Sequence, residues 1–127
     1  ARAATKAGQE MAIVNVASIL GLRVAGHLTA YATAKAGLVQ MTKSLALEWA
    51  RHDIRVNALC PGYIETPLNA AFFTSEQGQK LINRIPQRRL GQFDDLDGPL
   101  LLLASRSGRY LTGATLAVDG GHLVSSL

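Results

Sequence analysis

The sequence predicts an α/β fold with a parallel sheet, because short apolar runs alternate with segments of helical periodicity. Three runs supply the strands: MAIVNVA (11–17), IRVNALC (54–60) and TLAV (115–118). The first is almost continuously apolar and contains β-branched residues, which is typical of a strand buried on both faces of a sheet. With 127 residues, 48% of them hydrophobic and 17% charged, the chain can form one packed domain.

Helices are expected between these strands. From Thr29 to His52, apolar residues recur at steps of three and four, and Asp53 ends the pattern. The segments 65–73 and 75–85 predict two short helices on a surface connection.

A last helix is expected through the run LLLLAS, with Asp94 and Asp95 as candidate N-caps. Pro99 lies about one turn inside this helix, so the helix either begins late or bends. Residues 1–7 resemble the end of a helix whose beginning is missing, and three strands make a thin sheet. The sequence therefore predicts half of a doubly wound parallel sheet, with residues 1–127 as one portion of a single domain.

Composition narrows the range of functions. The net charge of +4 comes from scattered basic residues without interleaved aromatic residues, so no nucleic-acid partner is expected. No apolar run is long enough to cross a bilayer, so no membrane partner is expected either. The single cysteine, Cys60, fits a reducing compartment and a cytoplasmic protein. No spacing of metal-binding residue types predicts a metal site.

Three residues form a candidate catalytic group. Ser18 follows the first predicted strand, at the edge where open α/β sheets bind ligands. Tyr31 and Lys35 are four residues apart on the long predicted helix and therefore share a face. A neighbouring ammonium favours the ionised phenol, which can then exchange a proton with an alcohol oxygen that a serine hydroxyl holds. The spacing alone also fits an ordinary helix tyrosine, a solvated lysine and a turn serine.

The surrounding motifs separate these alternatives. IVNVASILG, YATAKAGLVQMTKSLALEWARHDIRVNALCPGYIETP and YLTGATLAVDGG occur in this order. In these motifs the sequence resembles the C-terminal half of the short-chain dehydrogenase/reductase family, from Met11 to Gly121. The resemblance implies a Rossmann-like α/β domain. It also implies an NAD- or NADP-dependent oxidoreductase that interconverts a small-molecule secondary alcohol and a ketone by hydride transfer.

The family assigns roles to the three candidate residues. The resemblance implies that Tyr31 is the general acid/base and that Ser18 steadies the substrate oxygen. It implies that Lys35 tunes Tyr31 and binds the nicotinamide ribose, so Tyr31 and Lys35 also belong to the cofactor site. The family further implies homodimers or homotetramers, and the surplus of apolar residues on the 29–52 helix fits this expectation.

The resemblance assigns the PGYIET stretch to the nicotinamide end of the cofactor. It implies that Pro61 and Gly62 shape the turn, that Ile64 offers backbone groups to the carboxamide, and that Thr66 reaches a phosphate or the carboxamide. A Pro-Gly turn at the carboxyl end of a strand independently fits a polar ligand. The segment from 69 to 89 is expected to be a mobile flap that sets substrate specificity.

The sequence departs from the family in the part that binds the other end of the cofactor. No two of its glycines lie two positions apart, so the glycine-rich dinucleotide fingerprint is not present. In the family this fingerprint, and the residue that selects NAD or NADP, belong to an N-terminal half that this chain is expected to lack. We therefore expect the 127 residues alone to be inactive. The alternative is a truncated, catalytically inactive relative that acts as an interaction module.

Overall fold

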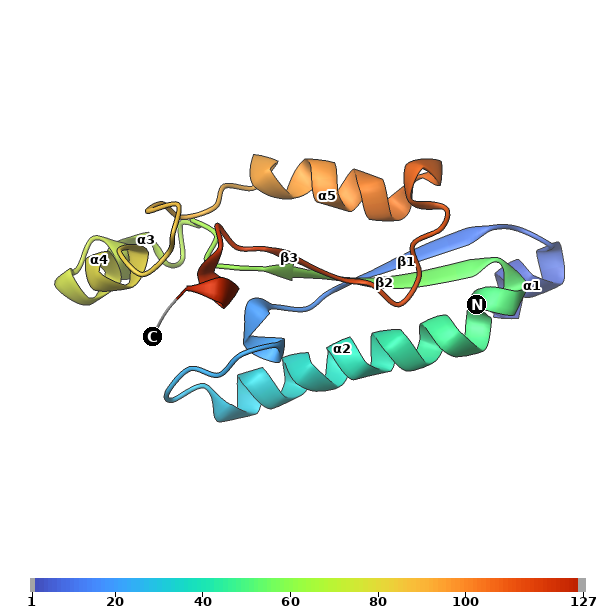
Figure 1. Ribbon diagram of the computed structural model, residues 1–127, viewed down its shortest axis with the longest axis horizontal. Helices are drawn as coiled ribbons and strands as arrows, with labels where there is room; N and C mark the ends of the chain where they lie inside the picture. Colours follow the sequence, from blue (N-terminus) through green and yellow to red (C-terminus); the bar gives the residue numbers. More distant parts are fainter. Residues whose placement is uncertain (1, 126–127) are drawn as a thin grey trace.

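The computed structural model describes residues 2–125 as a layered α/β/α arrangement (Figure 1). Its elements, in chain order, are α1 (Arg2–Ala7), β1 (Met11–Val16), η1 (Ile19–Gly21), α2 (Thr29–Trp49), η2 (Ala50–His52), β2 (Ile54–Pro61), α3 (Ala70–Phe73), α4 (Glu76–Ile82), α5 (Asp94–Ala104), η3 (Arg106–Gly108), β3 (Thr115–Val118) and η4 (His122–Val124). The alternation of strands and helices confirms the predicted α/β class.

The three strands form one parallel sheet in the order β1-β2-β3. β1 and β2 pair over six positions, beginning with Met11 opposite Ile54. β2 and β3 pair over four positions, beginning with Ala58 opposite Thr115. Because all three strands run in the same direction, their carboxyl ends meet at one edge of the sheet, and α3 and α4 follow at that edge (Figure 1).

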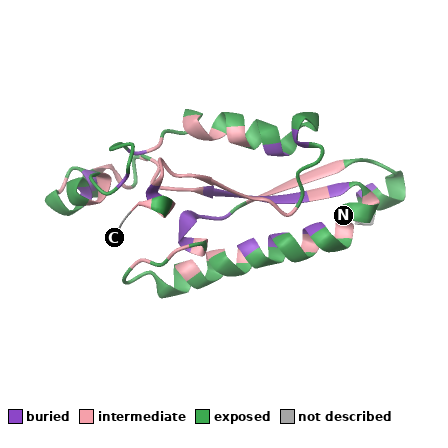
Figure 2. Cartoon of the chain, viewed as in Figure 1, coloured by how far each residue is buried: buried purple, intermediate pink, exposed green. Residues whose placement is uncertain are grey.

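The long helix α2 covers one face of the sheet and α5 covers the other (Figure 1). α2 buries Val39 and Ala46 against the central strand β2, of which Ile54 and Val56 are completely buried. Figure 2 shows this burial along β2 and on the inner side of α2. Burying each of these larger aliphatic side chains stabilises the fold by about 1.5–3 kcal/mol.

The first strand differs from its prediction. β1 is half-buried along most of its length and exposed at Val16, whereas the apolar run predicts burial on both faces. The physical reason is its place in the sheet, because β1 pairs only with β2 within residues 2–125. An edge strand leaves one row of backbone groups and part of its side chains uncovered.

The predicted ends of the shorter helices also need correction. α3 begins at Ala70 and α4 spans Glu76–Ile82, so both are shorter than the expected helices at 65–73 and 75–85. Asp94 and Asp95 are not N-caps, because they lie in the first turn of α5 and the cap position is Phe93. The Asp95 carboxylate instead accepts a hydrogen bond from the Gln92 N–H at 2.7 Å.

Candidate active site

Tyr31 and Lys35 lie on one face of α2, near its N-terminal end. The Lys35 ammonium nitrogen is 5.7 Å from the centroid of the Tyr31 ring, so a positive charge faces the phenol. The same ammonium donates a hydrogen bond of 2.9 Å to the carbonyl oxygen of Val16, the last residue of β1. Tyr31 is 46% exposed, so a substrate can approach it.

Ser18 lies at the carboxyl end of β1, two residues after the carbonyl that Lys35 binds. Its Oγ accepts a hydrogen bond of 3.1 Å from the Leu20 N–H and thereby caps η1. This bond is the one expected of a turn serine. A hydroxyl that accepts one hydrogen bond can still donate its own hydrogen, so the geometry is compatible with a second, catalytic contact.

Cys60 joins this group from β2. Its thiol is completely buried. Burial raises the pKa of Cys60, while a hydrogen bond with the Ser18 backbone and the charge of Lys35 act in the opposite direction. Cys60 in β2 therefore lies within electrostatic reach of both Ser18, which follows β1, and Lys35 on α2, and its raised pKa favours the protonated thiol.

Gly21 lets η1 pack directly on α2. A Cβ atom at position 21 would lie 2.8 Å from the carbonyl carbon and oxygen of Lys35, which is closer than packed atoms tolerate. We expect Gly21→Ala to lower the free energy of unfolding by about 1–3 kcal/mol, because the added methyl overpacks this contact. Urea unfolding measures the change. Gly26→Ala is the control, since a Cβ there meets no atom within 4 Å, and equal stability of the two variants would contradict this account.

The PGYIET loop leaves β2 at the same edge of the sheet. Pro61 pairs with Val118 of β3, and the Gly62 N–H donates a hydrogen bond of 2.9 Å to the Val118 carbonyl. A Cβ at position 62 would come within 2.8 Å of Asp119, so a glycine allows the loop to approach the end of β3. Pro61 is the last residue of β2, and the backbone turns only at residues 67–69, so the Pro-Gly turn expected from the sequence is not seen at Pro61 and Gly62.

The second half of this loop is held by side-chain contacts that no sequence pattern predicts. The Thr66 N–H donates to Asn69 Oδ1 at 2.9 Å, and Asn69 Nδ2 donates to the Ile64 carbonyl at 2.8 Å. On the other side, Gly91 exchanges backbone hydrogen bonds with the loop at Tyr63 and Glu65. The only sequence signal for Asn69 is its place just before a helix, where asparagine is a common N-cap.

Tyr63 belongs to a cluster that forms across the length of the chain. Its ring lies 5.5 Å from that of His122, whose carbonyl accepts a hydrogen bond from Arg23 Nη1. Burial raises the pKa of Tyr63; the charge of Arg23 opposes this shift and Tyr31 adds to it. Burial and Arg23 lower the pKa of His122, so its ring is neutral at neutral pH. Among residues 2–125, the buried His122 Nδ1 has no hydrogen-bond partner.

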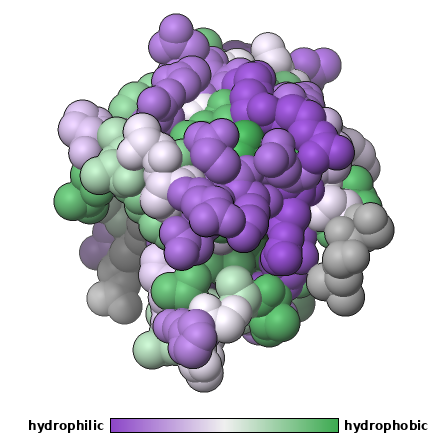
Figure 3. All heavy atoms as spheres, turned by 90° about the vertical axis from the view of Figure 1, so that its left-hand side faces the viewer, coloured by the Kyte–Doolittle hydropathy of each residue, from purple (hydrophilic) through white to green (hydrophobic). Residues whose placement is uncertain are grey.

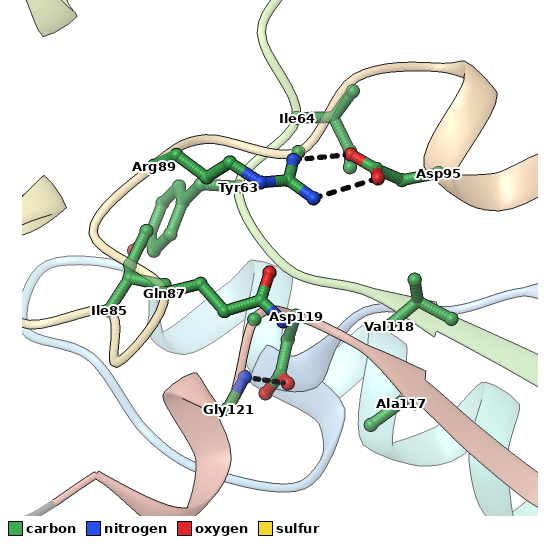
Figure 4. Close-up of a pocket in the computed structure, with 12 residues that line it drawn as sticks. Tyr63, Ile64, Ile85, Gln87, Arg89, Asp95, Ala117, Val118, Asp119 and Gly121 are labelled. Atoms are coloured by element: carbon green, nitrogen blue, oxygen red, sulfur yellow. Dashed lines mark hydrogen bonds and ion pairs between the residues drawn. The ribbon is translucent and has the colours of Figure 1, made fainter.

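A cavity of about 320 Å³ opens beside the PGYIET loop, between the 85–91 segment and the end of β3 (Figure 4). The Gln87 side chain points toward Asp119 there, while Arg89 forms an ion pair of 2.6 Å with Asp95. Hydrogen bonding to Arg89 lowers the pKa of Asp95 to about 2. None of the three predicted catalytic residues lines this cavity, whereas Ile64 of the predicted cofactor loop does.

The edge that carries the strand ends is strongly hydrophilic. Figure 3 shows this side of the molecule, where hydrophilic side chains gather around smaller apolar areas. Within residues 2–125, none of the helices combines the length and apolar character that crossing a bilayer requires. The same residues contain no group of three histidine, cysteine, aspartate or glutamate side chains that could hold a metal ion.

Known proteins are similar to this chain over most of its length. A family model described as enoyl-(acyl carrier protein) reductase matches residues 1–122. The chain is 40% identical to 2-dehydro-3-deoxy-D-gluconate 5-dehydrogenase of Escherichia coli over 112 residues, which are 87% of this chain and 44% of that protein. It is 40% identical to an L-rhamnose 1-dehydrogenase (NAD(P)(+)) of Azotobacter vinelandii over 126 residues, which are 98% of this chain and 49% of that protein.

Solved structures show the same similarity. Gluconate 5-dehydrogenase from Burkholderia cenocepacia, in complex with NADP and tartrate, superposes with a TM-score of 0.92 at 33% identity over 98% of this chain and 49% of that one. A 4-hydroxyisoleucine dehydrogenase complexed with NADH superposes with a TM-score of 0.93 at 28% identity over 98% of this chain and 52% of that one. These structures confirm the Rossmann-like fold. The chain spans about half the length of these relatives.

Proposed function

Since the chain belongs to the short-chain dehydrogenase/reductase family, we propose that it carries the catalytic half of an NAD- or NADP-dependent oxidoreductase. The enzyme would interconvert a secondary alcohol and a ketone. The observation that carries this proposal is the contact of Lys35 with both the Tyr31 ring and the Val16 carbonyl, at the strand end that bears Ser18. Packing alone does not require a tyrosine, a lysine and a serine to converge at this edge.

The proposed chemistry assigns one role to each side chain. In the oxidation direction, the ionised Tyr31 accepts the hydroxyl proton of the alcohol while the carbon–oxygen double bond forms. Ser18 donates its hydrogen to the substrate oxygen and holds it against Tyr31. Lys35 stabilises the ionised form of Tyr31 through its charge. A nicotinamide bound at this edge would accept the hydride from the substrate carbon that bears the alcohol oxygen.

The described residues fit the nicotinamide end of such a cofactor. Lys35 has three N–H groups, of which the Val16 carbonyl takes one, so donors remain for a ribose hydroxyl. We propose that the loop from Pro61 and Gly62 to Ile64 and Thr66 binds the carboxamide and the adjoining phosphate. Its site at the carboxyl ends of parallel strands supports this, since open α/β sheets bind ligands there.

Sugar acids are the first substrates to test. Two of the relatives above are named as gluconate-type dehydrogenases. All three arginines of the 69–89 segment are exposed, which supports an acidic substrate; Arg89 is paired with Asp95, and Arg88 donates a hydrogen bond to the Asn83 carbonyl.

We also propose that the enzyme is a cytoplasmic homodimer or homotetramer. Met41 and Leu47 on α2 are exposed although they are apolar, which supports a further packing partner for this helix. The buried thiol of Cys60, which forms no disulfide among the described residues, fits a reducing compartment.

The 127 residues alone should not bind NAD or NADP with useful affinity. Dinucleotide binding in this fold depends on a glycine-rich turn and helix N-terminus that hold the pyrophosphate, and the sequence has no such turn. Calorimetric titration with both cofactors compares the affinity of these 127 residues with that of the full-length protein. We expect binding by the full-length protein only; micromolar binding by the 127 residues would contradict the proposed division of the site.

A further inference from the structure

The Asn69 side chain points in an unusual direction for a residue at a helix N-cap. Asn69 is the N-cap residue of α3, and an asparagine there normally accepts a hydrogen bond from an N–H in the first turn of the helix. The structure has no such bond at Asn69. Both polar atoms of the side chain turn back along the chain instead, to the Ile64 carbonyl at 2.8 Å and the Thr66 N–H at 2.9 Å.

These two hydrogen bonds link Ile64 and Thr66 through the Asn69 side chain. Asn69 acts as donor to one loop residue and as acceptor from another, so Ile64 and Thr66 are held at a fixed separation. The backbone adds to this closure, since the N–H groups of Asn69 and Ala70 both donate to the Thr66 carbonyl at 3.1 Å. A half-buried side chain that satisfies two backbone groups of one loop restricts the conformations of that loop.

The opposite side of the loop is also fixed. Ile64 forms a parallel bridge with Gly91, and a Cβ at position 91 would lie 2.6 Å from Ile64 Cδ1. The Gln92 side chain donates a hydrogen bond of 2.7 Å to the Glu65 carboxylate. The 91–92 segment therefore supports one flank of the loop, and Asn69 alone supplies side-chain hydrogen bonds to the backbone of its other flank among the described residues.

We propose that Asn69 is a positioning residue for the cofactor: it presets the backbone of Ile64–Thr66 in the conformation that receives the nicotinamide. This inference rests on the proposed function, because that function assigns the loop to the cofactor. Asn69 itself need not touch the cofactor. A loop that is already ordered loses less conformational entropy when the cofactor binds. Removing the Asn69 contacts makes the loop more flexible and therefore weakens cofactor binding.

The test compares three variants of the full-length protein. Asn69→Ala removes both contacts. Asn69→Ser keeps a residue type that caps helices as well as asparagine does, but its short hydroxyl cannot bridge both backbone groups. Asn83→Ala is the matched control, because Asn83 is an exposed residue at the end of α4 whose side chain is not part of the loop.

We expect both Asn69 variants to raise the dissociation constants for NADH or NADPH about tenfold, while Asn83→Ala leaves them unchanged. Thermal unfolding midpoints of all three should stay close together, which separates loop positioning from general stability. Wild-type affinity in Asn69→Ser would overturn the inference, since the two contacts that a serine cannot make together would then not matter for cofactor binding. Unchanged affinity in Asn69→Ala would overturn it as well. If the wild-type protein binds neither cofactor, the proposed function fails and this inference fails with it.

Discussion

Replacing Tyr31 by phenylalanine should lower the turnover of the full-length protein by about 10²- to 10⁴-fold, because the proton-transferring hydroxyl is lost. The ring remains, and Tyr31 is only half-covered, so neither stability nor cofactor affinity should change appreciably. Initial rates of nicotinamide oxidation and a calorimetric cofactor titration measure the two quantities. Tyr110→Phe is the control, because Tyr110 is fully exposed. If Tyr31→Phe keeps more than about a tenth of the activity, Tyr31 is not the general acid/base.

Replacing Lys35 by alanine should lower both turnover and cofactor affinity, by about ten- to hundredfold each. One ammonium lies beside the Tyr31 ring and, in the proposed function, also binds the ribose. The variant also loses the bond to the Val16 carbonyl, so its unfolding should be measured in parallel. Lys43→Ala on the exposed side of α2 is the control. Unchanged cofactor affinity in a folded Lys35→Ala protein would remove the ribose contact from the mechanism.

The strongly patterned parts of the fold could be predicted from the sequence. β2, β3 and α2 with the following η2 lie where the sequence predicts strands and the 29–52 helix, because apolar runs define the two strands and apolar residues at steps of three and four define the helix. The burial of β1 could not be predicted, since it depends on which strand lies beside it and not on its own residues. The N-cap of α5 could not be predicted, because Asp95 uses its carboxylate to bind Arg89 and the Gln92 N–H and does not occupy the cap position.

The candidate site also has features that the sequence predicts and features that it does not. Tyr31 and Lys35 could be paired from the sequence because a spacing of four residues fixes their relation on any helix. The hydrogen bonds from the Asn69 side chain to its loop could not be predicted, because the path of a loop decides which backbone groups a short side chain reaches. The contact between Arg23 and His122 joins residues 99 positions apart, a separation for which the sequence carries no periodic signal.

Hydride transfer between the cofactor and a ketone can be followed directly with an isotope on the reduced cofactor. The full-length protein is incubated with NADH or NADPH deuterated at the nicotinamide carbon that carries the hydride, together with a panel of keto sugar acids and simpler ketones. Mass spectrometry then follows the deuterium. We expect an alcohol product with one deuterium on its carbinol carbon, formed by the wild-type protein and nearly lost in Tyr31→Phe. A folded protein that binds cofactor but transfers no deuterium to any ketone, or a Tyr31→Phe variant that transfers it at the wild-type rate, would contradict the proposed chemistry.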